Sequence, residues 1–228
     1  MKRLAIFLFL AFSANFVYSQ ESDFIIPDYE LIKSEIQDSA SIFYYPNLLS
    51  RLNAFDATLT NQDYRHLYFG FIFQEKYEPY WISPYELELS KYYQSRKIKE
   101  KEYDKIIELA THSINEFPFD LRQLNFLGFT YHLKGDEETA KKVAARFAGT
   151  LDAIISSGDG KTCETGYHVI SVYHEYVILK MFQFNMKSQS LTGDCDYLSL
   201  KHDERNIDGI YFNIKQLFNR NAENFKTE

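Results

Sequence analysis

His168 and His174 are the side chains of this sequence best suited to acid–base chemistry or metal binding, and Glu175 follows the second of them. The two histidines are six residues apart across an expected strand-to-helix junction, which is not the spacing of a recognised zinc site. Glu175 is expected at the start of a short helix, where the helix N-terminus already stabilises a carboxylate. Because no second positioned group is evident, the sequence does not support general acid–base catalysis.

Three other polar segments also fall short of a metal or nucleotide site. His202 is followed by two acidic residues, a pattern without zinc-ligand spacing. Asp194 and Asp196 flank a cysteine in an expected turn and lack the additional oxygen ligands of a calcium loop. The segment GDGKT at residues 158–162 ends like a phosphate-binding loop, but Ile155 stands where that loop requires glycine. We therefore expect no metal, no cofactor and no nucleotide.

The two cysteines, Cys163 and Cys195, allow three interpretations. In an oxidising compartment they can form one disulfide, and closing a loop of about 33 residues would stabilise the protein by roughly 3 to 4 kcal/mol. Pairing requires their α-carbons to lie within about 7 Å, which sequence spacing does not show. Two free, buried thiols are the second interpretation, and a catalytic cysteine with His168 or His174 as its base is the third.

The first residues are typical of a signal peptide. Two basic residues precede the apolar run LAIFLFLAF at residues 4–12, which has the length of a signal-peptide core and is too short to cross a bilayer. Val17 and Ser19 are small enough for the cleavage pocket, so we expect the mature chain to begin at Gln20. The absence of a cysteine near this site argues against a lipoprotein. A retained membrane anchor is the alternative.

Composition restricts the partners of the mature chain. Loss of two basic residues with the leader moves the formal net charge from -7 to about -9, which disfavours nucleic acid and anionic lipid as partners. No later stretch is long and apolar enough to span a membrane. We therefore expect a soluble protein that is periplasmic or secreted.

The sequence predicts helices in the first part of the mature chain. Three are expected in the aromatic N-terminal part, over residues 29–37, 46–54 and 62–74. Tyr77, Tyr80 and Trp81 then gather around two prolines in an extended segment. Exposed rings there would form a platform for sugars or peptides. Alternatively, they pack against the side of the helices. A further helix is expected over residues 84–96.

Residues 103–140 predict a pair of helices and the start of a third. Apolar residues recur at helical spacing over 103–117, and Pro118 ends that helix. Asp120 is the expected cap of the next helix. Gly128 lies inside it at a cost of about 1 kcal/mol relative to alanine, which is typical where another backbone passes close by.

Seven positions here match the signature of a tetratricopeptide repeat: Leu124, Leu127, Gly128, Tyr131, Gly135, Asp136 and Ala140. Pro118 and Tyr103 match positions of the preceding repeat. The region therefore resembles roughly one and a half of the 34-residue units of that family. Ala144 and Asp152 depart from the pattern, so the resemblance implies a short, degenerate array. An ordinary helical hairpin is the alternative.

Small, turn-forming residues at 156–162 predict a boundary near Gly158, after which strand patterns begin. We expect a strand at residues 167–172, a short helix at 173–184, strands at 187–191, 196–202 and 209–214, and a frayed tail from 219. The predicted fold class is α+β: tetratricopeptide-like helical hairpins followed by a small antiparallel sheet with one short helix. The expected parts are a signal peptide (1–19), a helical region (20–157) and an α+β module packed on it (158–228).

Several segments also resemble an uncharacterised family of exported bacterial proteins of similar length. They are LYFGFIFQEKYEPYW at 67–81, the glycines at 158 and 160, HVISV at 168–172, Glu175 with Tyr176, and IYFNI at 210–214. The resemblance covers nearly the whole mature chain. It implies no known activity and leaves the function open.

Two functions fit these observations. The first is a protein- or peptide-interaction module of the cell envelope, with contacts from Tyr77, Tyr80, Trp81, Leu124, Phe126 and Tyr131. The second is a small-ligand binder or enzyme with a site where helices meet sheet, near Tyr167, His174, Glu175 and Tyr176. We favour the first because the repeat signature spans many positions and no catalytic set is evident.

Overall fold

The computed structural model describes residues 24–95 and 97–224, with side chains up to residue 220. The expected signal peptide at residues 1–19 therefore lies outside the described residues. The described chain opens with α1 (Tyr29–Gln37), α2 (Tyr45–Asn53) and α3 (Asn61–Gly70), and a short 3-10 turn (Phe71–Phe73) extends α3. These bounds confirm the first three expected helices to within a few residues.

Local capping explains where these helices start. Asp28 accepts a hydrogen bond from the backbone N–H of Leu31 at the start of α1. Thr60 and Asp63 form a reciprocal capping box at the start of α3. Every residue of α3 from position 63 to 70 is buried, so this helix runs through the core of the molecule.

The next four helices follow the sequence pattern closely. They are α4 (Glu86–Tyr93), α5 (Tyr103–Glu116), α6 (Leu121–Lys134) and α7 (Glu137–Ile155), with a 3-10 turn (Glu100–Glu102) before α5. Asp120 caps α6 through the N–H of Gln123, as predicted. Gly135 closes α6 with a positive φ of 83°, a conformation that suits glycine.

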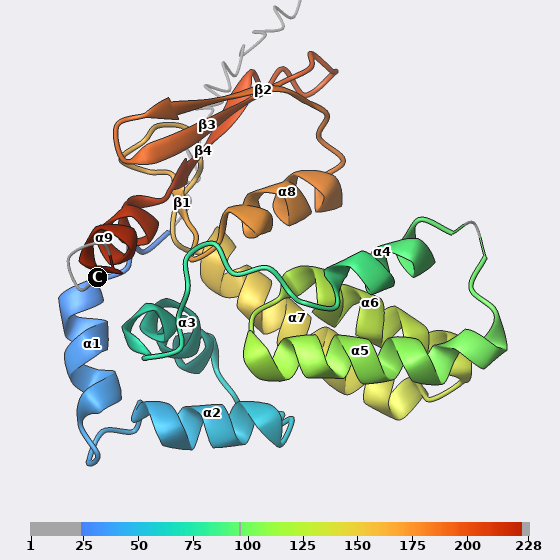
Figure 1. Ribbon diagram of the computed structural model, residues 1–228. Coiled ribbons are helices and arrows are strands. Elements are labelled where there is room, and N and C mark those ends of the chain that lie inside the picture. The colour runs from blue at the N-terminus through green and yellow to red at the C-terminus, as the bar shows by residue number, and fades with distance from the viewer. Residues whose placement is uncertain (1–23, 96, 225–228) are drawn as a thin grey trace, which may run out of the picture.

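Helix α6 packs against both α5 and α7 (Figure 1). A Cβ added at Gly128 would lie 3.6 Å from Val143 Cγ1 and 3.7 Å from the carbonyl oxygen of Ala140. The backbone of α7 therefore passes close to Gly128, as expected, although a methyl group still fits there.

The C-terminal part contains β1 (Tyr167–His168), α8 (Val172–Met181), β2 (Met186–Thr192), β3 (Cys195–Leu200), β4 (Gly209–Asn213) and α9 (Lys215–Asn224). The strand order is β1-β4-β3-β2. Strands β2, β3 and β4 pair antiparallel, but β1 pairs parallel to β4, so the prediction of an antiparallel sheet was wrong and the sheet is mixed.

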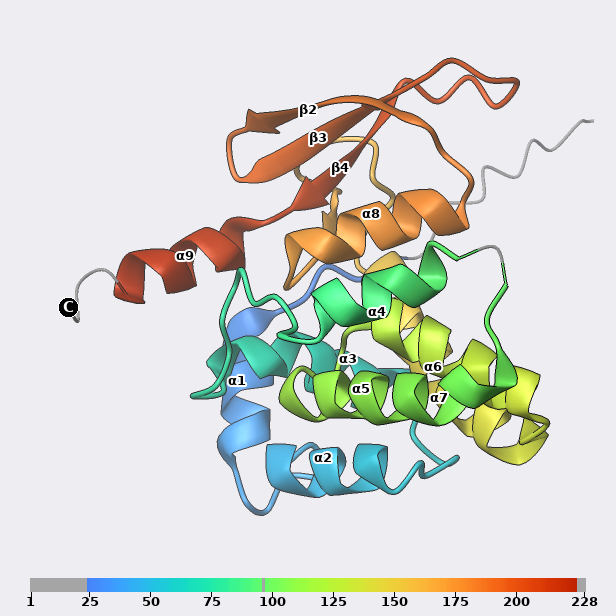
Figure 2. The ribbon, with the colours of Figure 1, turned by 45° about the vertical axis from the view of Figure 1, so that its right-hand side comes forward.

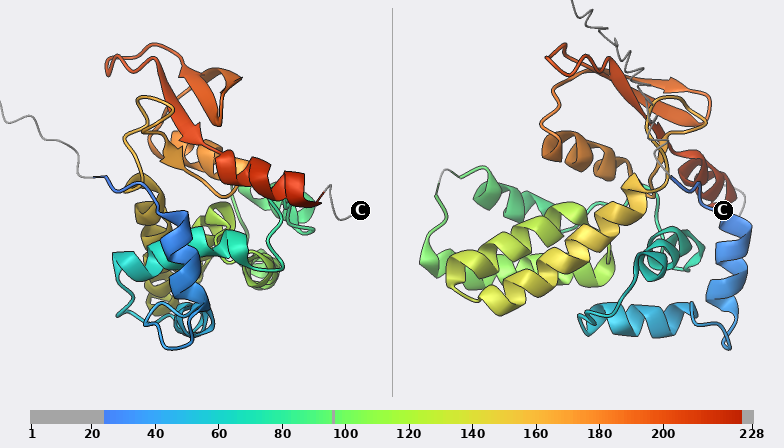
Figure 3. Two further views of the ribbon diagram at one scale, coloured as in Figure 1. Left: turned by 90° about the vertical axis from the view of Figure 1, so that its left-hand side faces the viewer. Right: turned by 180° about the vertical axis from the view of Figure 1, so that it is seen from behind.

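Two other expectations for this part were also wrong. The strand expected at 167–172 ends after two residues, because the hydroxyl of Ser171 caps α8 by accepting the N–H of Tyr173. The tail expected to fray from residue 219 instead continues α9 as far as Asn224. Helices α1 and α9 lie on the same side of the molecule (Figure 3).

The sheet and the first helices share one core. Helix α8 lies between the sheet and the other helices (Figures 1 and 2). The larger core cluster joins Tyr68 and Phe71 near α3 to Ile178 of α8 and Phe212 of β4. A second cluster lies among α4 to α7 and includes Leu89, Ile106, Leu124, Phe126 and Val143. The seam between α6 and α8 is where these two parts meet.

Candidate functional site

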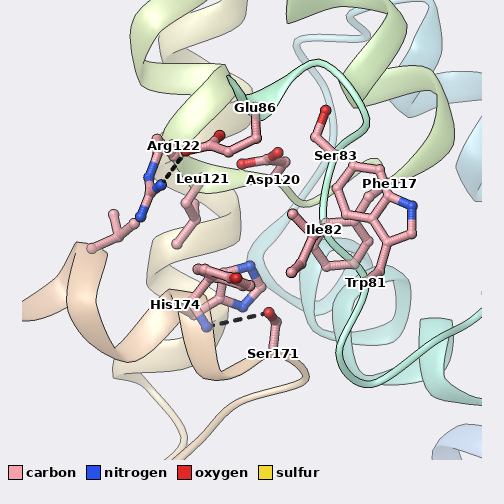
Figure 4. A pocket seen from close by; sticks show the side chains of 12 residues that line it. Trp81, Ile82, Ser83, Glu86, Phe117, Asp120, Leu121, Arg122, Ser171 and His174 are labelled. Carbon is pink, nitrogen blue, oxygen red and sulfur yellow. Dashed lines mark hydrogen bonds and ion pairs between the residues drawn. The ribbon is translucent and has the colours of Figure 1, made fainter. Parts of the chain in front are cut away.

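A groove follows this seam and consists of two adjoining hollows that share Arg122 and Val177; we call it the seam groove. The first hollow lies between the segment before α4, the α5–α6 turn and the start of α8 (Figure 4). It has a free volume of about 30 Å³, enough for a water molecule or two. The second hollow has a volume of about 630 Å³ and lies between α4, α6 and α8.

Three rings line the first hollow in a row. The ring centroids of Trp81 and Phe117 are 5.3 Å apart, and Phe117 stacks on His174 with an interplanar angle of 10° and a centroid separation of 5.7 Å. Figure 4 shows the side chains of Trp81 and Phe117 together on one side of the hollow. Aromatic pairs of this kind form rigid, mainly apolar walls.

The three aromatic residues proposed from the 77–81 segment take different positions. Tyr77 is buried and donates its hydroxyl to the carbonyl of Ile170 at 2.9 Å, so it packs into the core. Trp81 is half-buried and lines the groove, while Tyr80 is half exposed. The segment thus serves partly as core packing and partly as groove wall.

His174 is buried and both of its ring nitrogens have hydrogen-bond partners. Nε2 lies 2.9 Å from the carbonyl oxygen of Phe119, and Nδ1 lies 2.7 Å from the hydroxyl of Tyr68. Because a carbonyl only accepts, Nε2 carries the hydrogen and Tyr68 donates to Nδ1. Burial lowers the pKa of His174 to about 4, so the neutral ring is a packing element and not an available base.

The polar side of the first hollow is a network centred on Glu86. Its carboxylate accepts hydrogen bonds from Arg122 Nη1 at 2.6 Å, from Gln123 Nε2 at 3.1 Å and from the hydroxyl of Tyr93. Nearby, burial raises the pKa of Asp120 to about 6, although that carboxylate accepts from the N–H of Gln123. The network holds Arg122 at the junction of the two hollows, and Figure 4 shows its ion pair with Glu86.

Glu175 lies on the other side of α8, fully buried against Asp196 of β3. Among the described residues no N–H or O–H group donates to either carboxylate oxygen of Glu175. Asp196 accepts a hydrogen bond from Gln189 Nε2 at 2.8 Å, and the hydroxyl of Tyr176 donates to Gln189 Oε1. Burial, and then the charge of Asp196, raise the pKa of Glu175 to about 9. Glu175 is therefore protonated, and so uncharged, at neutral pH.

The remaining predicted site residues are distributed over both cores. Leu124 and Phe126 are buried in the second core cluster, although both line neighbouring surface hollows, and Tyr131 packs against that cluster. Tyr167 is half-buried at β1, with its ring 5.9 Å from that of Phe212. The neighbouring residues His174 and Glu175 therefore do not form one site. His174 lines the groove, and Glu175 faces the sheet.

Cys163 and Cys195 form a disulfide, with their α-carbons 5.7 Å apart. This pairing confirms the first of the three interpretations and leaves no thiol at these positions for catalysis. In the part of the chain that the structure describes, no group of three or more His, Cys, Asp or Glu side chains could hold a metal ion.

Sequence reasoning missed Glu86, Tyr93, Phe117 and Arg122. Each lies in or beside a helix, and the helical pattern alone accounts for its presence in the sequence. No sequence motif links the four residues. Only in the folded chain do Glu86, Phe117 and Arg122 meet the loop at Trp81 and the start of α8, while Tyr93 lines the second hollow.

The fold and site define a mixed α+β protein in which helices and a C-terminal sheet share a core and enclose a surface groove. Residues 30–223 match the family model described as "Domain of unknown function (DUF4919)", and the chain belongs to this family. Comparisons with the curated proteins and with the solved structures gave no match. None of the helices in the described ranges has the length and apolar character needed to cross a membrane.

Proposed function

We propose that the protein is an exported interaction module of the cell envelope that holds a peptide segment of a partner protein in the seam groove. The observation that carries this proposal is the continuity of the two hollows through Arg122 and Val177. In this proposal an extended segment enters the larger second hollow and passes over the rim of the small first one, whereas small-molecule sites usually enclose most of their ligand.

The rim of the groove supports a macromolecular partner. Ile82, Tyr173 and Met181 are 58%, 39% and 42% exposed, and they line its two ends. Large apolar side chains grouped around a hollow are typical of interaction sites. Lys180 in the second hollow makes no ion pair with a described residue and can bind an acidic group of the segment.

Export is supported by the signal-peptide pattern and by the disulfide, since disulfides persist mainly in oxidising compartments. Fractionation of cells followed by N-terminal sequencing tests this part of the proposal. We expect the protein in the periplasm or medium, beginning at Gln20. Recovery of the full-length chain from the cytoplasm or the membrane would contradict it.

The tetratricopeptide-like signature at residues 103–140 is a second source of support, because stacked helical repeats commonly present extended binding surfaces. In this proposal α6 contributes one wall of the groove, and Trp81 with Tyr173 contributes aromatic contacts. The two leucines of the signature, Leu124 and Leu127, are buried and stabilise α6 from inside, and groove residues around them contact the partner.

The proposal is tested by affinity capture from envelope extract with groove and control variants. Ile82→Asp and Met181→Asp place a charge at opposite ends of the groove, and Leu191→Asp does so at an exposed position on β2. We expect the unmodified protein and Leu191→Asp to capture the same protein, and both groove variants to lose it. Capture that is unchanged in both groove variants would contradict the proposal.

A small-ligand site is the second candidate, because the larger hollow has about 630 Å³, within the usual range for ligand pockets. A thermal-shift screen with sugars, metals and nucleotides separates the two candidates. A rise in melting temperature with one of these compounds, together with no captured protein, would favour the ligand binder.

A further inference from the structure

A separate hollow of about 470 Å³ lies between the C-terminal end of α2, the start of α3 and α7; we call it the α7 hollow. Figure 3, right, shows α7 on the near side, with α2 and α3 beside it. The exposed face of α7 is made of small residues here, including Ala145 and Ala148, and this leaves the space open. Neither Arg122 nor Val177 lines this hollow, so it is distinct from the seam groove.

Arg146 lines the α7 hollow and is a buried cation without a counter-ion. Arg146 is only 5% exposed. Nη2 donates to the carbonyl of Pro118 at 2.9 Å, while Nε is fully buried and lacks a hydrogen-bond partner among the described residues. No carboxylate of the described chain forms an ion pair with it. Buried charges are normally paired, because an uncompensated one is costly to remove from water.

Tyr64 lines the same hollow. The residue is 8% exposed, and its hydroxyl makes no hydrogen bond with any described residue. Unlike Nε of Arg146, this hydroxyl is not fully buried, so it is open to a ligand from solvent. Its ring is held firmly, since a Cβ at Gly149 would lie only 2.3 Å from Tyr64 Cε2. Burial raises the pKa of Tyr64, and the charge of Arg146 opposes this effect, so the two groups interact.

The other charges around the hollow leave room for an anion. Lys141 is exposed and makes no ion pair with a described residue. Lys142 pairs with Glu138 at 2.7 Å. Two carboxylates also line the hollow: Asp56 is neutralised by Arg51 at 2.7 Å, and Asp152 is exposed to solvent. The buried part of the hollow is therefore positive, and its negative groups are at the rim or already paired.

We propose that the α7 hollow binds a small oxyanion, a carboxylate or phosphate group, between Arg146 and Tyr64. The oxyanion compensates the guanidinium charge and accepts the hydrogen of the tyrosine hydroxyl. Hydrogen bonds between charged partners are the strong ones, and arginine is well suited to these two anions. Lys141 adds positive charge at the entrance.

The test is thermal unfolding and calorimetric titration of the full mature chain with inorganic phosphate and with acetate, against chloride at equal ionic strength. We expect phosphate, acetate or both to raise the melting temperature saturably, and chloride to have no such effect. The two arms show whether the site prefers phosphate or carboxylate.

Two variants and one control locate the effect. Arg146→Met removes the charge at similar length, and Tyr64→Phe keeps the ring against Gly149 but removes the hydroxyl. We expect each to weaken anion binding by about tenfold or more, the loss typical of one charge-assisted hydrogen bond. Lys161→Gln alters an exposed cation that is not among the residues lining the hollow and should leave binding unchanged.

Either of two results would overturn the proposal. One is that phosphate and acetate shift the melting temperature no more than chloride does. The other is that the anions stabilise Tyr64→Phe as much as they stabilise the unmodified protein. Because Tyr64→Phe keeps the packing ring, this comparison remains possible even if Arg146→Met does not fold.

Discussion

At the scale of single residues, Glu175 and His174 are neighbours that are both neutral at pH 7 for the same reason. Burial raises the pKa of the acid to about 9 and lowers the pKa of the base to about 4. Each group is uncharged because the charged form would lose its hydration inside the protein. Neither has the accessibility of a catalytic group, so both are better understood as parts that hold α8 in place.

Glu175→Gln should stabilise the protein at neutral and alkaline pH. The pKa of Glu175 rises from 4.5 in the unfolded chain to about 9 in the folded protein. Its stabilising contribution is thus complete below pH 4.5 and is lost as the pH rises towards 9. Glutamine mimics the protonated acid without this loss, so we expect a gain on the order of 2 to 3 kcal/mol at pH 7.

Urea unfolding at pH 5, 7 and 8.5 measures this effect. The gain should grow with pH, and Glu116→Gln, a change at an exposed position of α5, should show almost none. Destabilisation by Glu175→Gln at every pH would mean that the folded protein needs the charged carboxylate.

His174 should remain neutral down to about pH 4, with the hydrogen on Nε2. Its folded pKa lies below the ordinary value of 6.5, so folding stability should fall as the pH drops from about 6.5 towards 4. Nitrogen-15 NMR of the imidazole reports both the tautomer and the titration. A midpoint near 6.5 would contradict the assignment of both ring nitrogens to hydrogen bonds.

At the scale of elements, the close packing of α7 on α3 requires glycine at position 149, whereas the packing of α6 on α7 does not require glycine at position 128. Gly149 lets α7 approach the ring of Tyr64 on α3, since a Cβ there would be only 2.3 Å from that ring. Gly128 on α6 has space for a methyl group, because its nearest neighbours would be at 3.6 Å and 3.7 Å.

Gly149→Ala should therefore destabilise the protein by about 1 to 3 kcal/mol, the usual effect of overpacking. Gly128→Ala should be neutral or stabilise it by up to about 1 kcal/mol, because alanine favours helices. Gly128→Leu should destabilise by a clash with Val143 on α7. Chemical denaturation of the three variants measures these effects; equal results for the two alanine variants would contradict the difference in packing.

At the scale of the whole molecule, the helical part and the sheet stabilise each other. The larger core cluster includes Tyr68 and Phe71 as well as Ile170, Ile178 and Phe212, which come from opposite ends of the chain. Removal of residues 158–228 would expose the apolar surfaces that these side chains bury.

A chain that ends at residue 157 should therefore lose the fixed tertiary structure of α1 to α3 while retaining helical content. Near-ultraviolet circular dichroism and amide exchange, compared with a chain of residues 20–228, test this. A cooperative thermal transition with native near-ultraviolet signals would show that the helical region folds by itself.

The local elements were largely predictable from sequence. The starts of α1 and α6 follow from their caps and the end of α5 from Pro118, all of which act within a few residues. The segment at 167–172 was misread because a short apolar run fits strand and helix alike, and the cap at Ser171 decides for helix. The parallel pairing of β1 with β4 joins residues more than forty positions apart, so no local pattern indicates it.

The sequence by itself determined the α+β class, most helix ends, the family and the residues from which a site could be built. Tertiary structure alone decided that Trp81, Phe117 and His174 form one wall, that Cys163 meets Cys195, and which charged groups are buried. The physical reason is that helix caps and periodicity act between neighbours in the chain. Burial, ring contacts and pKa depend instead on groups that only folding brings together.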